Sequence, residues 1–129
     1  MAVSYTTTLR NGTLDAITST VGNAGTLKIY DGTKPAAGGA ATTLLATFTL
    51  GSPFAAAAAA AVLSPTLPSA TTGVAASTAT WFRVSTSGGT WIMDGTAGTS
   101  GTDLILNTAT ISVGVAVSIT GWTITAGNA

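Results

Sequence analysis

The feature that most limits the fold of this chain is the way in which short runs of β-forming residues alternate with glycine and proline. Residues 26–30 alternate polar and apolar side chains and end at the turn dipeptide Asp31-Gly32, and residues 43–50 end at Gly51 and Pro53. The same pattern recurs in residues 81–86, 90–94, 104–106, 111–113 and 115–125. Strands at such short spacing predict a mainly β chain, either an antiparallel β-sandwich or a jelly-roll-like barrel.

One short helix is predicted near the N-terminus, before the strands begin. Leu14, Ile17 and Val21 have the i, i+3, i+7 spacing of a helical apolar stripe, and Thr13 is a candidate N-cap. Asp15 would then lie in the first turn, where the helix dipole favours a negative charge. Such a helix, about nine residues long, is marginal alone and must pack its stripe on the rest of the chain.

The alanine run at residues 55–61 is ambiguous by local rules. Ser52 as a cap, with Pro53 at the first helical position, favours a helix of high intrinsic propensity. The glycine, threonine and proline residues on both sides favour an extended segment, in which small side chains allow close approach to another backbone. Both conformations remain open from the residues alone.

A hairpin is predicted around Gly88-Gly89, and its register decides which side chains share a face. A two-residue turn would pair Arg83 with Asp94 as a cross-strand ion pair and Val84 with Met93. One face of this hairpin then faces the core, and the other faces away with Trp81 and Arg83. The predicted core residues, including two from the last strands, are Phe82, Val84, Trp91, Met93, Ile119 and Ile124.

Charge is scarce, and this excludes several classes of function. The 129 residues include four Lys and Arg and four Asp, with no Glu, His or Cys, so the net charge is zero. A chain without a basic patch lacks the usual electrostatic attraction to nucleic acid or acidic membranes. The longest apolar run, residues 54–63, is too short to span a bilayer. The N-terminus lacks the basic start of a signal peptide, which predicts synthesis in the cytoplasm.

No catalytic motif is recognisable, so we expect that the chain is not an enzyme and uses no metal or cofactor. Without histidine, the serine residues have no ordinary base, and the loop between Asp94 and Asp103 lacks the ligand spacing of a calcium loop. Exposed tryptophans can stack on sugar rings, and among Trp81, Trp91 and Trp122 the pattern points only Trp81 away from the core. A carbohydrate-binding module is therefore an alternative function.

Several segments together resemble small structural proteins of tailed bacteriophages, and within that group capsid decoration, or cement, proteins. They are GTLKIYDGTKPA, LLATFTL with SPF, TATWFRV, GGTWIMDGTAG, DLILN and VSITGWTITAGN. The resemblance implies that the alanine run is extended. It also implies a β-rich subunit on the outside of a capsid, commonly a homotrimer that contacts the major capsid protein and stabilises the shell against internal DNA pressure.

The resemblance further predicts an arm that adds a strand to a neighbouring sheet. Residues 1–9 suit such an arm, and residues 10–129 would form a single β-rich domain. The candidate partner contacts are Val3, Tyr5, Thr7, Leu9, Trp81 and Arg83. A tail-tube, neck or baseplate subunit would share the same character and is the main alternative position in a virion.

Overall fold

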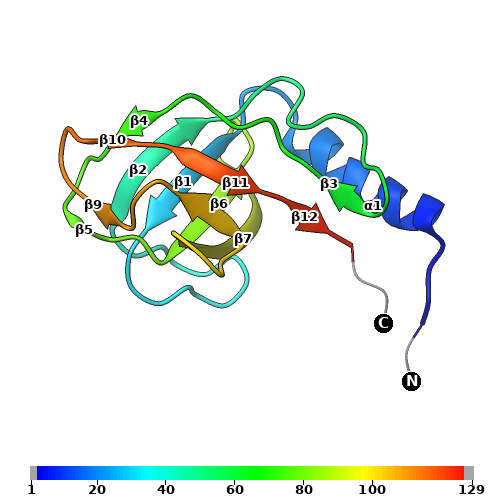
Figure 1. Cartoon of the computed structure of the whole chain (residues 1–129), viewed down its shortest axis with the longest axis horizontal. Helices are drawn as coiled ribbons and strands as arrows, with labels where there is room; N and C mark the ends of the chain where they lie inside the picture. The colour runs from blue at the N-terminus through cyan, green and yellow to red at the C-terminus, as the bar shows by residue number, and fades with distance from the viewer. Residues whose placement is uncertain (1–2, 127–129) are drawn as a thin grey trace.

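The structure, a computed structural model, describes residues 3–126 and is mainly β with one N-terminal helix. Its largest element is a six-stranded sheet that curls on itself, and three two-stranded sheets extend it into a sandwich-like or barrel-like body (Figure 1). The elements in chain order are α1 (Thr7–Val21), β1 (Thr26–Tyr30), β2 (Leu44–Thr49), β3 (Val62–Leu63), β4 (Thr71–Thr72), β5 (Ser77–Thr78), β6 (Trp81–Ser85), β7 (Trp91–Gly98), β8 (Leu104–Leu106), β9 (Thr110–Ile111), β10 (Ala116–Val117), β11 (Ile119–Trp122) and β12 (Ile124–Thr125).

The strand order in the main sheet is β11-β8-β7-β6-β1-β2. Its pairs are antiparallel except for β7 and β8, which run parallel, so the predicted antiparallel sandwich-like or barrel-like body contains one parallel pair in this sheet. The small sheets are β10-β4, β12-β3 and β5-β9. They pair segments that are far apart in the sequence, which is how the C-terminal strands return to the middle of the chain.

The core lies on one side of the main sheet, against the small sheets and the alanine run. Strand alternation sends Leu27 and Ile29 of β1 and Phe82 and Val84 of β6 to this side, where all four are buried. The Trp122 ring meets the rings of Phe54 and Phe82 edge to face, with centroids 5.3 and 5.6 Å apart. Of the predicted core, Ile119 is also buried, and Met93 and Ile124 pack at its margin.

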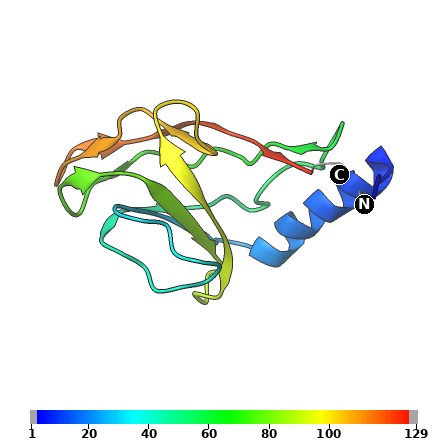
Figure 2. The same cartoon turned by 90° about the horizontal axis from the view of Figure 1, so that it is seen from below.

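The alanine run is extended as far as Ala59, as the resemblance implied. Ala55 bridges Pro65 and Ala59 bridges Val62, and the run folds back through a turn at Ala60 and Ala61, which both have positive φ. Helix α1 lies along this segment at one end of the molecule, as Figure 2 shows from a second direction.

The helix begins earlier than the sequence predicted. Its N-cap is Thr6, whose hydroxyl accepts a hydrogen bond from the N–H of Leu9 at 3.2 Å. Thr13 is therefore not a cap but an interior residue whose hydroxyl donates to the carbonyl of Leu9. Asp15 likewise lies in mid-helix, so the dipole argument made for it is wrong. The pattern misled because Arg10, Asn11 and Gly12 interrupt the apolar stripe without interrupting the helix.

The hairpin forms the predicted ion pair between Arg83 and Asp94, although its turn differs from the predicted one. The N–H of Gly89 donates to the carbonyl of Thr86, and the N–H of Thr86 donates to the carbonyl of Thr90. The loop between Thr86 and Thr90 therefore holds three residues rather than two. A bulge then shifts the register so that Ser85 faces Trp91. Because the bulge absorbs the extra residue, the predicted partners of Val84 and Arg83 are restored, and the predicted register was wrong between the turn and this bulge.

Candidate interaction surfaces

A pocket of about 450 Å³ lies where the N-terminal end of α1 meets the C-terminal strand. It is lined by Tyr5, Leu9, Arg10, Thr13 and Ala126. Tyr5 and Leu9, which line it, are each about half exposed although they are aromatic or apolar. We call this pocket with its two exposed side chains the helix-end surface. Large apolar groups gathered around a hollow are typical of a contact site rather than of scattered surface residues.

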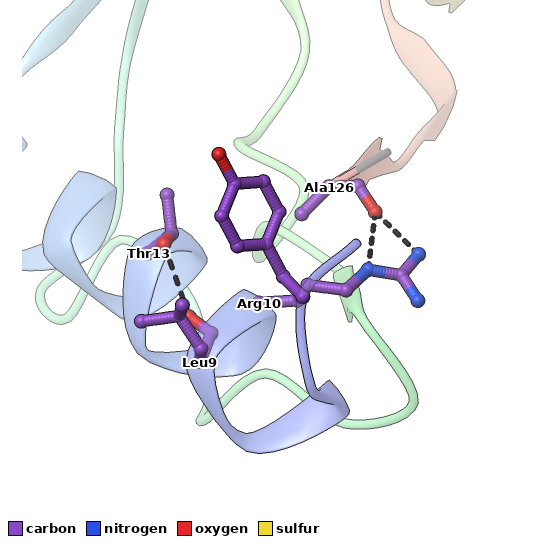
Figure 3. A pocket seen from close by; sticks show the side chains of 5 residues that line it. Leu9, Arg10, Thr13 and Ala126 are labelled. Atoms are coloured by element: carbon purple, nitrogen blue, oxygen red, sulfur yellow. Dashed lines mark hydrogen bonds between the residues drawn. The ribbon is translucent and has the colours of Figure 1, made fainter. Parts of the chain in front are cut away.

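Local helix geometry places the lining residues. The Thr6 cap starts the helix at Thr7, which puts Leu9 in the first turn and Thr13 one turn later on the same face. The Thr13 hydroxyl donates to the Leu9 carbonyl at 3.0 Å, and Figure 3 shows these two residues along one wall of the pocket. The helix start, which the sequence pattern missed, therefore decides what lines this pocket.

Arg10 joins the helix to the end of the chain's last strand. Its Nε donates to the carbonyl of Ala126 at 2.9 Å, and its Nη2 donates to the same oxygen (Figure 3). Two further side chains of α1 bind main-chain N–H groups of the alanine run: Asn11 Oδ1 accepts from Ala61, and Asp15 Oδ1 accepts from Ala58. The charged groups on this part of the helix are thus engaged inside the protein.

The structure places the predicted arm residues partly in this helix. The arm was predicted over residues 1–9, but Thr7 and Leu9 lie in the first turn of α1, so a strand-forming arm of that length is wrong. Residues 3–6 precede the helix without regular structure, and residues 1–2 lie outside the described residues. Val3, Tyr5, Thr7 and Leu9 are all exposed, and their role as partner contacts stays a prediction.

Trp81 is fully buried, so its prediction as an exposed contact or sugar-stacking residue is wrong. It lies on the face of β6 opposite the core, beneath the segment 31–43 that connects β1 and β2. Its Nε1 donates to the Asp31 carbonyl and the Thr42 hydroxyl, both at 3.0 Å. The Tyr30 ring stacks on it with centroids 4.5 Å apart. Alternation identified the face correctly but could not reveal the loop that covers it.

Arg83 is also engaged beneath this segment rather than free on the surface. Its Nε and Nη2 donate to the two carboxylate oxygens of Asp94 at 2.7 and 2.9 Å, and Nη2 also donates to the Gly39 carbonyl. Only 14% of the Arg83 side chain and 4% of the Asp94 side chain are exposed. The guanidinium also lies 5.2 Å from the centre of the Trp81 ring. Arg83 can therefore offer a partner only the small exposed fraction of its side chain.

The electrostatics of this cluster follow from burial and hydrogen bonding. The hydrogen bonds to Asp94 raise the pKa of Arg83, which stays charged at any ordinary pH. Burial raises the pKa of the Tyr30 phenol. A side-chain hydrogen bond with Ser77, helped by the N–H of Thr43, lowers the pKa of Asp31. The cluster fixes the 31–43 segment and offers no acid or base poised near neutral pH.

Trp91 is the exposed tryptophan of the three, although the sequence placed it in the core. About 41% of it is accessible, and its ring lies against Gly38 on the 31–43 segment. The bulge in the hairpin is the reason, because it adds a residue between Met93 and the turn and so changes the side of the sheet that Trp91 occupies. Sequence alternation alone could not have detected it.

A second exposed apolar surface was not predicted at all. Val74, Val113 and Val115 protrude from two loops that lie side by side, residues 73–76 and 112–115. We call these three residues the valine tip. A signal did exist in the sequence, since residues 70–80 and 104–118 contain no charged side chain. Depletion of charge is typical of the centre of protein interfaces.

In the part of the chain that the structure describes, the acidic residues are held in separate hydrogen-bonded arrangements rather than in one cluster. Asp103 Oδ2 accepts hydrogen bonds from the N–H and hydroxyl of Thr96, and Asp94 is paired with Arg83. The loop predicted between Asp94 and Asp103 is shorter than expected, because β7 continues to Gly98. Between residues 3 and 126, no three His, Cys, Asp or Glu residues come together as metal ligands do.

Comparison with protein-family models, with curated proteins and with solved structures gave no match to this chain. Within residues 3–126, α1 is neither long nor apolar enough to cross a membrane.

Proposed function

We propose that this chain is a structural subunit of a tailed-bacteriophage particle. It binds the outer surface of the capsid as a decoration, or cement, protein and stabilises the shell against the pressure of packed DNA. Its partners are the major capsid protein and further copies of itself, as a homotrimer. It is made in the host cytoplasm and ends on the capsid exterior, and it has no catalytic role.

The observation that carries this proposal is the helix-end surface. Tyr5 and Leu9 are exposed together at a pocket that both of them line. Burying one such side chain against a partner contributes about 1.5–3 kcal/mol before the costs of association. A single contact of this size is weak, but symmetry repeats it many times over a capsid, and the sum supplies cohesion.

The scarcity of charge supports the same role. The chain has eight charged side chains in 129 residues, so docking has to remove water from few charged groups. Six of them are held by internal bonds, namely Arg10, Asp15, Asp31, Arg83, Asp94 and Asp103. Binding to the capsid should therefore depend mainly on apolar contact and only mildly on ionic strength.

Two measurements test the proposal. Quantitative mass spectrometry of purified particles of the phage that encodes the chain should find it in numbers comparable with the major capsid protein. Expanded capsids that lack it should bind the purified chain almost equally at about 50 mM and 500 mM salt. The reason is that salt screens contacts between charges and has little such effect on contacts between apolar groups. A few copies per particle would instead favour the tail-tube, neck or baseplate alternative, and release at moderate salt would contradict apolar docking.

A carbohydrate-binding module is the second candidate, and the exposed ring of Trp91 is the observation that favours it. Titration with polysaccharide from the host surface should then change tryptophan fluorescence, and Trp91→Ala should abolish the change. Unchanged fluorescence at saturating polysaccharide would remove this candidate.

A further inference from the structure

The helix-end surface and the valine tip lie at opposite ends of the molecule. In Figure 1 helix α1 and strands β3 and β12 are at one end of the long axis, and β4, β5, β9 and β10 are at the other. Figure 2, turned by 90°, shows the same separation. The chain therefore presents two different exposed apolar surfaces that face in different directions.

The valine tip is a rigid projection. Gly114 N–H donates to the Gly73 carbonyl and Gly73 N–H donates to the Val115 carbonyl, each at 3.0 Å, so two loops brace each other. A Cβ at Gly73 would lie 2.3 Å from the Ser112 carbonyl oxygen, and glycine is what permits this approach. Side chains held in place before binding lose little conformational freedom when they dock.

The two surfaces are complementary in shape and in charge. One presents three exposed valines on two loops at one end of the molecule, and the other is a hollow of about 450 Å³. The strands and loops around the tip, residues 70–80 and 104–118, contain no charge. Among the described residues, the charged group that lines the pocket is Arg10, which already donates to the Ala126 carbonyl. Bringing the surfaces together would leave no newly buried charge without a partner.

Pairing like with like is less favourable. Two protruding tips would touch over a small area, and two facing pockets would enclose a void lined by apolar groups. A protrusion that enters a hollow removes more apolar surface from water and leaves fewer gaps. The second copy of this chain is thus the occupant that the two shapes select.

We propose that the valine tip of one copy docks into the helix-end pocket of the next copy. Such an interface is heterologous, and it forms a closed ring when the rotation between neighbours closes. A threefold ring needs this kind of interface, since each subunit must offer two different surfaces. The inference deepens the proposed function, on which the number three rests, and assigns the two surfaces that hold the trimer together.

The test uses the full chain, two variants and a control. Val113→Asp places a charge on the tip, and Leu9→Asp places one in the pocket, where the first turn of a helix tolerates a negative charge well. Leu67→Asp is the matched control, because Leu67 is exposed to a similar extent but belongs to neither surface. Circular dichroism and thermal unfolding establish that each variant is folded.

Sedimentation equilibrium then measures mass over a wide range of concentration. The wild type and Leu67→Asp should approach the mass of three chains, and Val113→Asp and Leu9→Asp should each associate at least tenfold more weakly. An equal mixture of Val113→Asp and Leu9→Asp should form a two-chain complex, because the intact tip of the second fits the intact pocket of the first. That rescue is the specific signature of the pairing.

Other outcomes overturn it. If Leu9→Asp associates as well as the wild type, the pocket is not needed and the contact joins two valine tips. If Val113→Asp associates as well as the wild type, the tip is not needed and the contact joins two pockets. A mixture of the two variants that stays monomeric also rejects the pairing, as does a wild type that is monomeric throughout. The number of copies per particle tests the proposed function separately, so failure of one does not imply failure of the other.

Discussion

The carboxylate of Asp15 accepts a hydrogen bond from the main-chain N–H of Ala58, with an O···N distance of 2.7 Å. An extended segment of alanines has no side-chain hydrogen-bonding groups, so its main-chain donors need partners from elsewhere in the fold. Helix α1 supplies two of them, Asp15 for Ala58 and Asn11 one turn earlier for Ala61. The helix therefore stabilises the alanine run as well as covering it.

We predict that Asp15→Ala lowers the free energy of unfolding by about 1–2 kcal/mol, because it leaves the Ala58 N–H without its acceptor. Amide hydrogen exchange should show lost protection at Ala58. Asp15→Asn is the matched control, since the amide oxygen can still accept this bond and most of the protection should remain. Unchanged exchange at Ala58 in Asp15→Ala would contradict the anchoring role.

Arg83→Met should lower the free energy of unfolding by about 3 kcal/mol, because a nearly buried Asp94 carboxylate would lose its partner. Chemical denaturation measures the change. Lys28→Met, on the neighbouring strand β1 opposite Arg83, is the control and should change stability by less than about 0.5 kcal/mol. The double variant Arg83→Met with Asp94→Leu should recover part of the loss, and no recovery would argue against an ion-pair origin.

Stability should decrease in alkaline solution because burial raises the pKa of Tyr30. The contribution is complete below the ordinary tyrosine pKa of about 10, where both states hold the phenol proton. As the pH rises, the unfolded chain loses that proton first, so the free energy of unfolding falls until the folded pKa is passed. Tyr30→Phe should flatten this fall in denaturation curves measured between about pH 9 and 11. An identical slope in the variant would refute the prediction.

Acrylamide should quench the tryptophan fluorescence mainly through Trp91, since Trp81 and Trp122 are buried. Trp91→Phe should leave an emission that is hard to quench, with little loss of stability. Trp81→Phe should keep the quenchable component but destabilise the chain by about 1–3 kcal/mol, because the Asp31 carbonyl and Thr42 hydroxyl lose a donor. The reverse assignment would mean that the hairpin bulge is misplaced.

Two glycine-to-alanine substitutions should act in opposite directions. Gly12 lies inside α1 with open space where a methyl group would be added, so Gly12→Ala should stabilise by about 0.5–1 kcal/mol. At Gly73 the same methyl group would collide with the Ser112 carbonyl, so Gly73→Ala should destabilise strongly and displace the valine tip. Thermal unfolding compares the two, and a neutral Gly73→Ala would mean that the loops are not in close contact.

Much of the fold was predictable from local patterns. The alternation in β1 and β6, the pairing of Arg83 with Asp94 and the mainly β character followed from the residues. These features depend on neighbours within a few residues, or across one hairpin, where sequence spacing fixes geometry directly. The start of α1 was missed because capping by Thr6 outweighed a weak apolar stripe.

Local sequence patterns could not predict which of the tryptophans are exposed. Alternation assigned Trp81 to the face of β6 away from the core, and this was correct, yet that face is covered by the 31–43 segment. Trp91 was assigned to the core by a register that one bulged residue shifts. A period of two says which residues share a face but not whether anything covers that face.

The sequence by itself determined that this chain is β-rich and nearly free of charge, and that it has no histidine or cysteine with which to build common catalytic or metal sites. Tertiary structure alone decided where the exposed apolar groups gather, at the helix-end surface and at the valine tip. Each surface joins segments that are distant in the sequence, such as Leu9 with Ala126 and Val74 with Val113. Their juxtaposition depends on long-range pairing of strands, which residue type and spacing do not encode.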